Sequence, residues 1–96
     1  MVVTLPGKQV RISVVDDEVL IASTLAKVLC NRGFDASFFT EPLQALQSAQ
    51  YYASDLLISE VSMPVLSGIE LAIRVRRYCP SCKVLLFSGQ PDTTEL

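Results

Sequence analysis

The stretch Asp55-Leu-Leu-Ile-Ser-Glu60-Val-Ser-Met-Pro64-Val-Leu-Ser-Gly68 decides the fold of this 96-residue chain. Residues 56–58 are apolar without polar alternation, which is typical of a strand covered on both faces of a parallel sheet. Glu60 follows as an acidic tip. Ser67-Gly-Ile-Glu70 has the spacing of a capping box, in which a serine and a glutamate close the first turn of a helix. The stretch therefore predicts a buried strand, an acidic tip and a turn into a helix.

Strands and helices alternate on both sides of this stretch. We expect further strands at 10–15, 36–39 and 84–87, the last also buried on both faces, and helices that open near residues 18, 40 and 67. Gly33 is the expected left-handed stop of the first helix, and Thr40 the expected cap of the second. This alternation predicts an α/β fold with helices on both faces of a parallel sheet. The apolar rows expected to be buried are Ile21, Leu25, Val28 and Leu29, then Leu43, Leu46 and Ala49, then Leu71, Val75 and Tyr78.

The composition is that of a single globular domain with a real core. Half of the residues are apolar and 19% are charged. A net charge of -2, with eight scattered Lys and Arg residues, argues against a nucleic-acid partner. The sequence has no apolar run as long as a membrane span and no basic region before an apolar stretch. We therefore expect a cytoplasmic protein without a membrane partner.

Cys79-Pro-Ser-Cys82 has the C-x-x-C spacing of redox and zinc sites. Reactive pairs of this kind usually begin at a helix N-terminus, where the helix dipole stabilises thiolate. Cys79 instead falls at the end of a helical pattern, and the chain has no histidine and no second C-x-x-C. We expect loop thiols here, with a redox or metal pair as the alternative.

Acidic residues follow the expected strands at the edge where ligands bind. In an open parallel sheet, ligands bind at the carboxyl ends of the strands. Asp16 and Asp17 end the first strand, Glu60 the third and Ser88 the fourth. Carboxylates that share a pocket repel each other unless a cation is present, and Mg²⁺ prefers oxygen ligands. A magnesium site is one interpretation; an acidic pair that only caps the next helix is the other.

Three motifs in this order resemble the receiver domain of a two-component response regulator, over roughly residues 10–96. They are Val14-Val-Asp16-Asp17-Glu18, the stretch 55–68, and Phe87-Ser88-Gly89. The resemblance implies a flavodoxin-like three-layer parallel sheet with strand order 2-1-3-4. It also implies a signalling module rather than an enzyme, whose partners are a histidine kinase or a downstream signalling protein.

The resemblance also assigns roles to single residues. Glu60 stands at the phosphoacceptor position, and Ser88 matches the hydroxyl that hydrogen-bonds the bound phosphoryl group. The ligands implied for Mg²⁺ are the acidic pair, the acceptor position and the carbonyl two residues beyond it: Asp16, Asp17, Glu60 and Ser62.

Glu60 departs from the family, which has an aspartate at this position. Its carboxylate reaches about 1.5 Å further, the length of one C–C bond. Phosphoryl transfer depends on positioning, and an error near 1 Å can cost about a hundredfold in rate. We therefore expect impaired phosphorylation. Three interpretations stay open: a partial mimic of the phosphorylated state, an inert packing module, and a glutamate that is still phosphorylated.

The fifth strand and helix of a receiver, with the lysine that follows that strand, have no counterpart in this sequence. We expect residues 1–9 to be an N-terminal leader and 10–96 a receiver-like domain that is incomplete at its C-terminus. The strand at 84–87 would then be an apolar edge, which is an association hazard. Either the chain is a truncated product, or it covers this edge by dimerising.

A metal-dependent phosphatase or phosphotransferase with an aspartate nucleophile is the alternative function. The haloacid-dehalogenase class of such enzymes requires Asp-x-Asp after the first strand. Here Asp16 and Asp17 are adjacent, and no Lys or Arg follows to bind a substrate phosphate. An assay on a generic aryl phosphate separates this alternative from a binding module.

Overall fold

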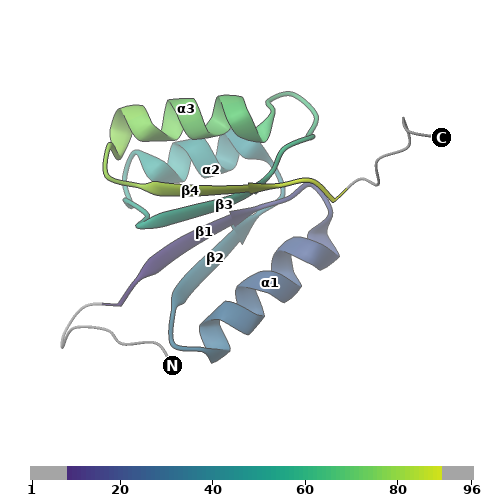
Figure 1. Ribbon diagram of the computed structural model, residues 1–96, viewed down its shortest axis with the longest axis vertical. Coiled ribbons are helices and arrows are strands. Elements are labelled where there is room, and N and C mark those ends of the chain that lie inside the picture. Colours follow the sequence, from purple (N-terminus) through teal and green to yellow (C-terminus); the bar gives the residue numbers. More distant parts are fainter. Residues whose placement is uncertain (1–8, 90–96) are drawn as a thin grey trace.

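The computed structural model describes residues 9–89, which form one parallel sheet with helices on both faces (Figure 1). The sheet order is β2-β1-β3-β4, and every neighbouring pair is parallel, so the expected order 2-1-3-4 is confirmed. The expected leader lies outside the described residues apart from Gln9, as do residues 90–96. In chain order the elements are β1 (Arg11–Val15), α1 (Val19–Asn31), β2 (Asp35–Phe39), α2 (Pro42–Ala49), β3 (Leu56–Glu60), α3 (Gly68–Tyr78) and β4 (Lys83–Phe87).

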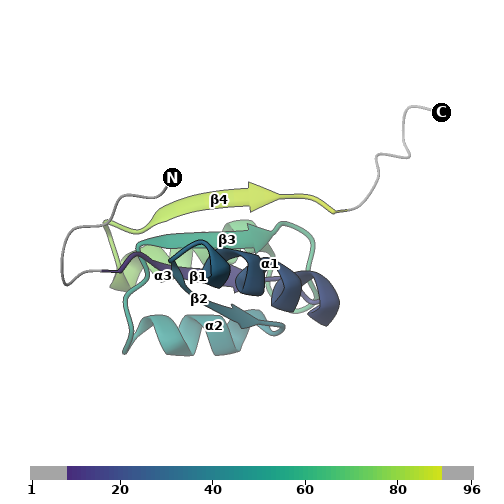
Figure 2. The ribbon, with the colours of Figure 1, turned by 90° about the horizontal axis from the view of Figure 1, so that it is seen from below.

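Helix α1 covers one face of the sheet, and α2 and α3 cover the other (Figure 1). Figure 2 shows the sheet from below, with β4 at one edge and β2 at the other. The central strand β3 is buried on both faces, as expected, because Leu57 and Ile58 belong to different cores. The core under α2 and α3 contains Val15, Ala45, Leu57, Leu66, Leu71, Ala72, Val75, Cys79 and Cys82, and the core under α1 contains Ile12, Val14, Ala22, Ala26 and Ile58.

The ends of α1 and α3 follow the local sequence signals. Gly33 has φ +96°, and its N–H donates to the carbonyl of Cys30 at 3.1 Å, while the next N–H donates to Leu29 at 3.2 Å. These two bonds form the Schellman motif that ends α1, so the expected stop is confirmed. The Ser67 hydroxyl accepts from the N–H of Glu70 at 3.1 Å and caps α3.

The expected cap of α2 is wrong. Helix α2 begins at Pro42, so the cap position falls on Glu41 rather than Thr40. The Glu41 side chain makes no capping hydrogen bond. Proline at the first helical position lacks an N–H and has a φ suited to the helix, so it starts α2 without a side-chain cap.

Part of the expected apolar row of α1 is wrong as well. Helix α1 buries Ala22 and Ala26, while Ile21 is 39% and Val28 47% exposed. The small alanines let α1 sit close over β2 and β1, which within residues 9–89 leaves the same face of β4 open. The exposed residues line an open apolar groove of about 610 Å³, the α1–β4 groove, whose full lining is Leu20, Ile21, Thr24, Leu25, Val28, Ile58, Leu85 and Phe87.

Three further residues expected inside are on the surface. Leu43 is 51% exposed, because α2 turns Pro42 and Ala45 inward instead. Tyr78 is 53% exposed at the last turn of α3. Leu85 is 56% exposed because it faces the α1–β4 groove, so β4 is not buried on both faces.

The connection from β3 to α3 is a tight loop that closes over the end of β3. The N–H of Leu66 donates to the carbonyl of Pro64 at 2.8 Å, which makes a γ-turn centred on Val65 with φ +74°. A β-branched residue in this region is strained. At the end of the loop, Gly68 lies so close to β3 that a Cβ there would overlap the carbonyl oxygen of Glu60. The loop backbone therefore packs directly against Glu60.

Candidate functional site

The carboxyl ends of β1, β3 and β4 meet at one rim of the sheet. Glu60 is the last residue of β3 and lies opposite Phe87, and the N–H of Val61 donates to the Phe87 carbonyl at 2.8 Å. Asp16 directly follows β1 and is 1% exposed, while Glu60 is 5% exposed. Asp17 and Ser88 lie on the surface of the same rim. An open depression of about 510 Å³ lies beside this rim, lined by Asp17, Val61, Ser62, Met63, Pro64 and Ser67.

The Glu60 carboxylate accepts hydrogen bonds from three backbone N–H groups. Its Oε1 accepts from Gly89 at 2.7 Å, and its Oε2 accepts from Val61 at 2.8 Å and from Ser62 at 3.3 Å. The Val61 N–H is shared between Oε2 and the Phe87 carbonyl. We call these three N–H groups the amide nest. Hydrogen bonds to an ionised acceptor are roughly twice as strong as neutral ones. The glutamate therefore ties its own loop to the end of β4.

Sequence reasoning missed this nest. It assigned a role to the Ser88 hydroxyl but none to the backbone N–H of the next residue, Gly89, which donates to Glu60. A Cβ on Gly89 would lie 2.9 Å from Oε1 of Glu60, so a larger residue there would displace the end of the glutamate side chain. The glycine after Ser88 was the available signal, but only the fold shows which oxygen it faces.

Asp16 lies at the same rim as Glu60 but accepts no hydrogen bond from the amide nest. Its Oδ1 accepts from the N–H of Glu18 at 2.9 Å. Its Oδ2 is buried and has no hydrogen-bond partner in the described part of the chain. Burial raises the pKa of Asp16, the Glu18 N–H lowers it, and repulsion by Glu60, Asp17 and Glu18 raises it further. A buried carboxylate oxygen without a partner, among other acids, is the kind of group that a cation satisfies.

The residues of the rim fit a magnesium ion in part. Across residues 9–89, no group of three or more His, Cys, Asp or Glu side chains is arranged to hold a metal. The Glu60 carboxylate is turned to the amide nest, which leaves Asp16 and Asp17 as the carboxylates for such a site. Mg²⁺ commonly binds through one or two carboxylates and keeps several waters. The donor set therefore suits Mg²⁺ without the third carboxylate.

The two cysteines of the C-x-x-C motif pack in the core under α2 and α3. Cys79 is 6% and Cys82 1% exposed, and both are free thiols. Their Sγ atoms contact backbone carbonyls, Cys79 that of Ala49 at 3.6 Å and Cys82 that of Lys83 at 3.3 Å. Burial raises the pKa of Cys82, which keeps the thiol protonated and unreactive. This placement suits packing rather than redox chemistry.

An open parallel α/β sheet binds its ligands at the carboxyl ends of its strands, and the acidic rim lies at this edge. A model of the response regulator receiver domain family matches residues 12–96 of this chain. The chain therefore belongs to the response regulator receiver domain family.

Individual relatives agree with this assignment. The DNA-binding response regulator MtrA of Mycobacterium tuberculosis is 30% identical over 86 residues, which are 90% of this chain and 37% of MtrA. The chain thus spans less than two-fifths of that relative.

No helix within residues 9–89 is long and apolar enough to cross a membrane.

Solved structures show the same fold. The chemotaxis protein CheY4 of Vibrio cholerae superposes with a TM-score of 0.81 at 24% identity, covering 92% of this chain and 75% of CheY4. A chain from the complex of histidine kinase ThkA with response regulator TrrA superposes with a TM-score of 0.76 at 29% identity, covering 90% of this chain and 74% of that one.

Asp16→Asn should stabilise the domain at neutral pH. Its raised native pKa means that the folded wild type binds more protons than the unfolded chain, so wild-type stability falls as pH rises through that pKa. The asparagine variant lacks this loss and can still accept from Glu18. We expect a gain of about 1 kcal/mol at pH 7 that vanishes below about pH 4. Urea unfolding of both proteins across this pH range measures the gain in stability. A variant less stable than the wild type at pH 7 would contradict the raised pKa of Asp16.

Proposed function

We propose that this receiver domain carries its own permanent anion, the Glu60 carboxylate, in the place where other receivers accept a phosphoryl group. The observation that supports this is the set of three N–H bonds from Val61, Ser62 and Gly89 to that carboxylate. Receiver domains are generally signalling modules without enzymatic activity of their own. Here the signalling state would depend on Glu60 rather than on phosphorylation.

Phosphorylation at Glu60 would be impaired for two reasons. Both carboxylate oxygens are engaged by N–H donors, so an attacking oxygen would first have to leave the amide nest. The extra methylene also shifts the carboxylate relative to the acidic pair, and positioning errors near 1 Å cost about a hundredfold. The backbone N–H groups that would donate to the oxygens of a phosphoryl group already donate to the Glu60 carboxylate.

The same geometry would make Glu60 a partial mimic of a phosphorylated receiver. A phosphoryl group carries close to two negative charges and three acceptor oxygens, whereas glutamate carries one charge on two oxygens. The Gly89 N–H nevertheless donates to Oε1 of Glu60 at 2.7 Å, which links the segment after β4 to the end of β3. We infer that the single charge of Glu60 holds the domain in the conformation that phosphorylation would otherwise favour. The Ser88 hydroxyl would remain available to a larger anion.

Magnesium would bind at the acidic pair. Asp16 and Asp17 would hold the ion, with the Ser62 carbonyl as a backbone ligand and water in the other positions. The ion would neutralise the repulsion among Asp16, Asp17 and Glu60. Its binding would also give the unpartnered Oδ2 of Asp16 a ligand. Glu60 would join only after leaving the amide nest.

The partners we propose are a histidine kinase or a downstream signalling protein, in the cytoplasm, with no nucleic acid bound by this domain. One solved structure similar to this chain is the complex of histidine kinase ThkA with response regulator TrrA, which supports a kinase as the partner. The net charge of -2 supports the absence of a nucleic-acid surface on this domain.

A second copy of the chain is a further proposed partner, through the edge strand β4. Within residues 9–89, β4 pairs with β3 on one side and with no strand on the other. Its exposed Leu85 continues into the α1–β4 groove. An apolar edge of this kind favours association with another strand.

Glu60→Asp should restore phosphorylation that the wild type lacks. An aspartate is too short to keep all of the amide-nest bonds and returns the family's acceptor geometry. Intact-mass measurement after incubation with acetyl phosphate and Mg²⁺ should show a phosphate adduct on Glu60→Asp only, with Glu60→Gln as the unlabelled control. An adduct on the wild type would show that the glutamate is still a live acceptor.

Magnesium should stabilise the wild type by the linkage RT ln(1 + [L]/Kd). The gain is about 2.7 kcal/mol at one hundred times Kd, which corresponds to a rise in Tm of roughly 10 °C or more for a domain of this size. Thermal unfolding across a Mg²⁺ titration at constant ionic strength measures it. Asp17→Asn should lose most of the gain, and an unchanged wild-type Tm would rule out the metal site.

Leu85→Lys should abolish self-association of the domain. A charge at the centre of β4 cannot be buried without a large desolvation cost. We expect wild-type sedimentation to depend on protein concentration and the variant to sediment as a monomer, with unchanged circular dichroism. Ile73→Lys, at a 50% exposed position of α3, is the matched control and should associate like the wild type. A wild type that stays monomeric would contradict the proposal.

A further inference from the structure

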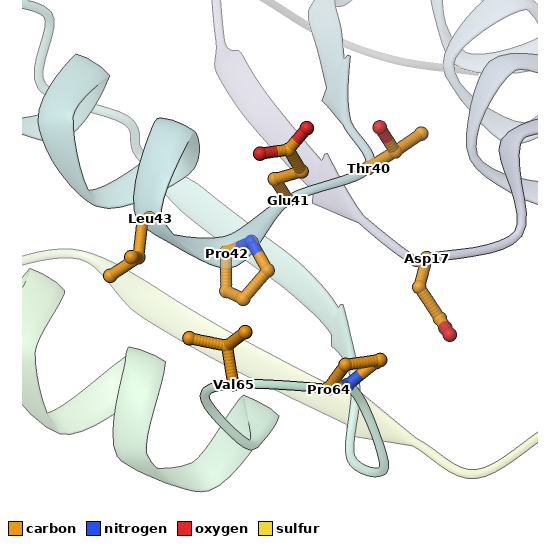
Figure 3. Close-up of a pocket in the computed structure, with 7 residues that line it drawn as sticks. All are labelled: Asp17, Thr40, Glu41, Pro42, Leu43, Pro64 and Val65. Carbon is orange, nitrogen blue, oxygen red and sulfur yellow. The ribbon is translucent and has the colours of Figure 1, made fainter.

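A second concave surface lies beside the acidic rim, between the start of α2 and the γ-turn of the β3–α3 loop (Figure 3). We call it the α2–turn groove. Its volume is about 230 Å³, which is below the range of roughly 300–1,000 Å³ typical of ligand pockets and suits a single side chain better than a cofactor. Its lining is Asp17, Thr40, Glu41, Pro42, Leu43, Pro64 and Val65.

The floor of the groove is apolar and open to solvent. Figure 3 shows the ring of Pro42 facing Val65 and Pro64 across the groove. Val65 is 83% exposed and Leu43 51% exposed. Val65 also holds φ +74°, a conformation that is strained for a β-branched residue. An exposed position would favour a polar residue, and a positive φ would favour glycine or asparagine. A partner that buries Val65 would account for a valine at this position.

The rim of the groove is acidic. Asp17 and Glu41 are both exposed, and the Glu41 side chain makes no capping bond to α2. In Figure 3 the Asp17 side chain extends on the side of Pro64, while that of Glu41 extends the other way. No Lys or Arg is among the lining residues. One cation cannot meet both carboxylates, so the complementary ligand carries positive charge on both sides of an apolar group.

We propose that the α2–turn groove docks a segment of a partner protein in which one aliphatic side chain is flanked by basic residues. The aliphatic group packs between Pro42, Pro64 and Val65, and the basic groups face Asp17 and Glu41. The apolar contact supplies affinity, while the charges supply orientation and a faster association. This docking does not depend on phosphorylation or on the amide nest at Glu60, so it goes beyond the proposed function.

A backbone chemical-shift titration of the full chain tests the proposal. The probe is the peptide acetyl-Lys-Lys-Leu-Lys-Lys-amide, at low salt and with EDTA, because Asp17 also belongs to the proposed metal site. We expect shifts confined to the seven lining residues and their neighbours. Peptides with serine in place of leucine, or glutamate in place of lysine, should each bind at least about tenfold more weakly. Equal binding of either reference peptide would overturn the proposal.

Variants separate the groove from the rest of the surface. Val65→Gly should raise Tm, because it relieves the strained φ, and yet weaken the leucine peptide about fivefold. Glu41→Gln should weaken it about twofold. Ile73→Ala removes a 50% exposed aliphatic group outside the groove and should bind like the wild type.

Three results would overturn the docking site. Val65→Gly could bind as tightly as the wild type, or Ile73→Ala could weaken binding as much as Val65→Gly does. The same shifts could also arise from raising the protein concentration without peptide, which would make a second copy of the chain the occupant.

Discussion

The burial of both faces of β3 is the constraint from which the rest of this structure follows. Neighbouring residues in a strand point to opposite faces, so Leu57 and Ile58 require apolar layers on both sides of the sheet. β3 must then lie inside the sheet, paired with β1 and β4, with helices above and below. This register brings Glu60 opposite Phe87 and beside the end of β1. The position of the candidate site is therefore a consequence of packing.

Two buried carboxylates at this rim have opposite environments, and the backbone accounts for the difference. The loop after β3 closes tightly because Gly68 lies against the Glu60 carbonyl, and this closure points loop N–H groups at the Glu60 side chain. Asp16 receives one N–H, and its other oxygen has no hydrogen-bond partner within residues 9–89. The hydrogen bonds of Glu60 hold its carboxylate in place, while the second oxygen of Asp16 is suited to bind a cation.

The two apolar surfaces of the domain differ in their charge, and this difference separates the partners proposed for them. The α1–β4 groove is lined by aliphatic and aromatic side chains with a single threonine, and it borders β4, the edge strand of the sheet within residues 9–89. Such a surface suits a second apolar surface. The lining of the α2–turn groove combines a small apolar floor with the acidic residues Asp17 and Glu41. Charges at a rim discriminate among partners, because the wrong partner leaves like charges facing each other.

The sequence by itself determined the alternation of strands and helices through its apolar patterns. It also determined the stop at Gly33 and the cap at Ser67, because these two depend on hydrogen bonds between residues a few positions apart. It also predicted the acidic rim, since strand ends of a parallel sheet meet at one edge. Only the tertiary structure decided that Ile21, Val28 and Tyr78 lie on the surface, because burial depends on which neighbouring element covers a face. The direction of the Glu60 carboxylate was likewise beyond the sequence. It is set by the N–H of Gly89, a residue 29 positions away that only the pairing of β3 with β4 brings within reach.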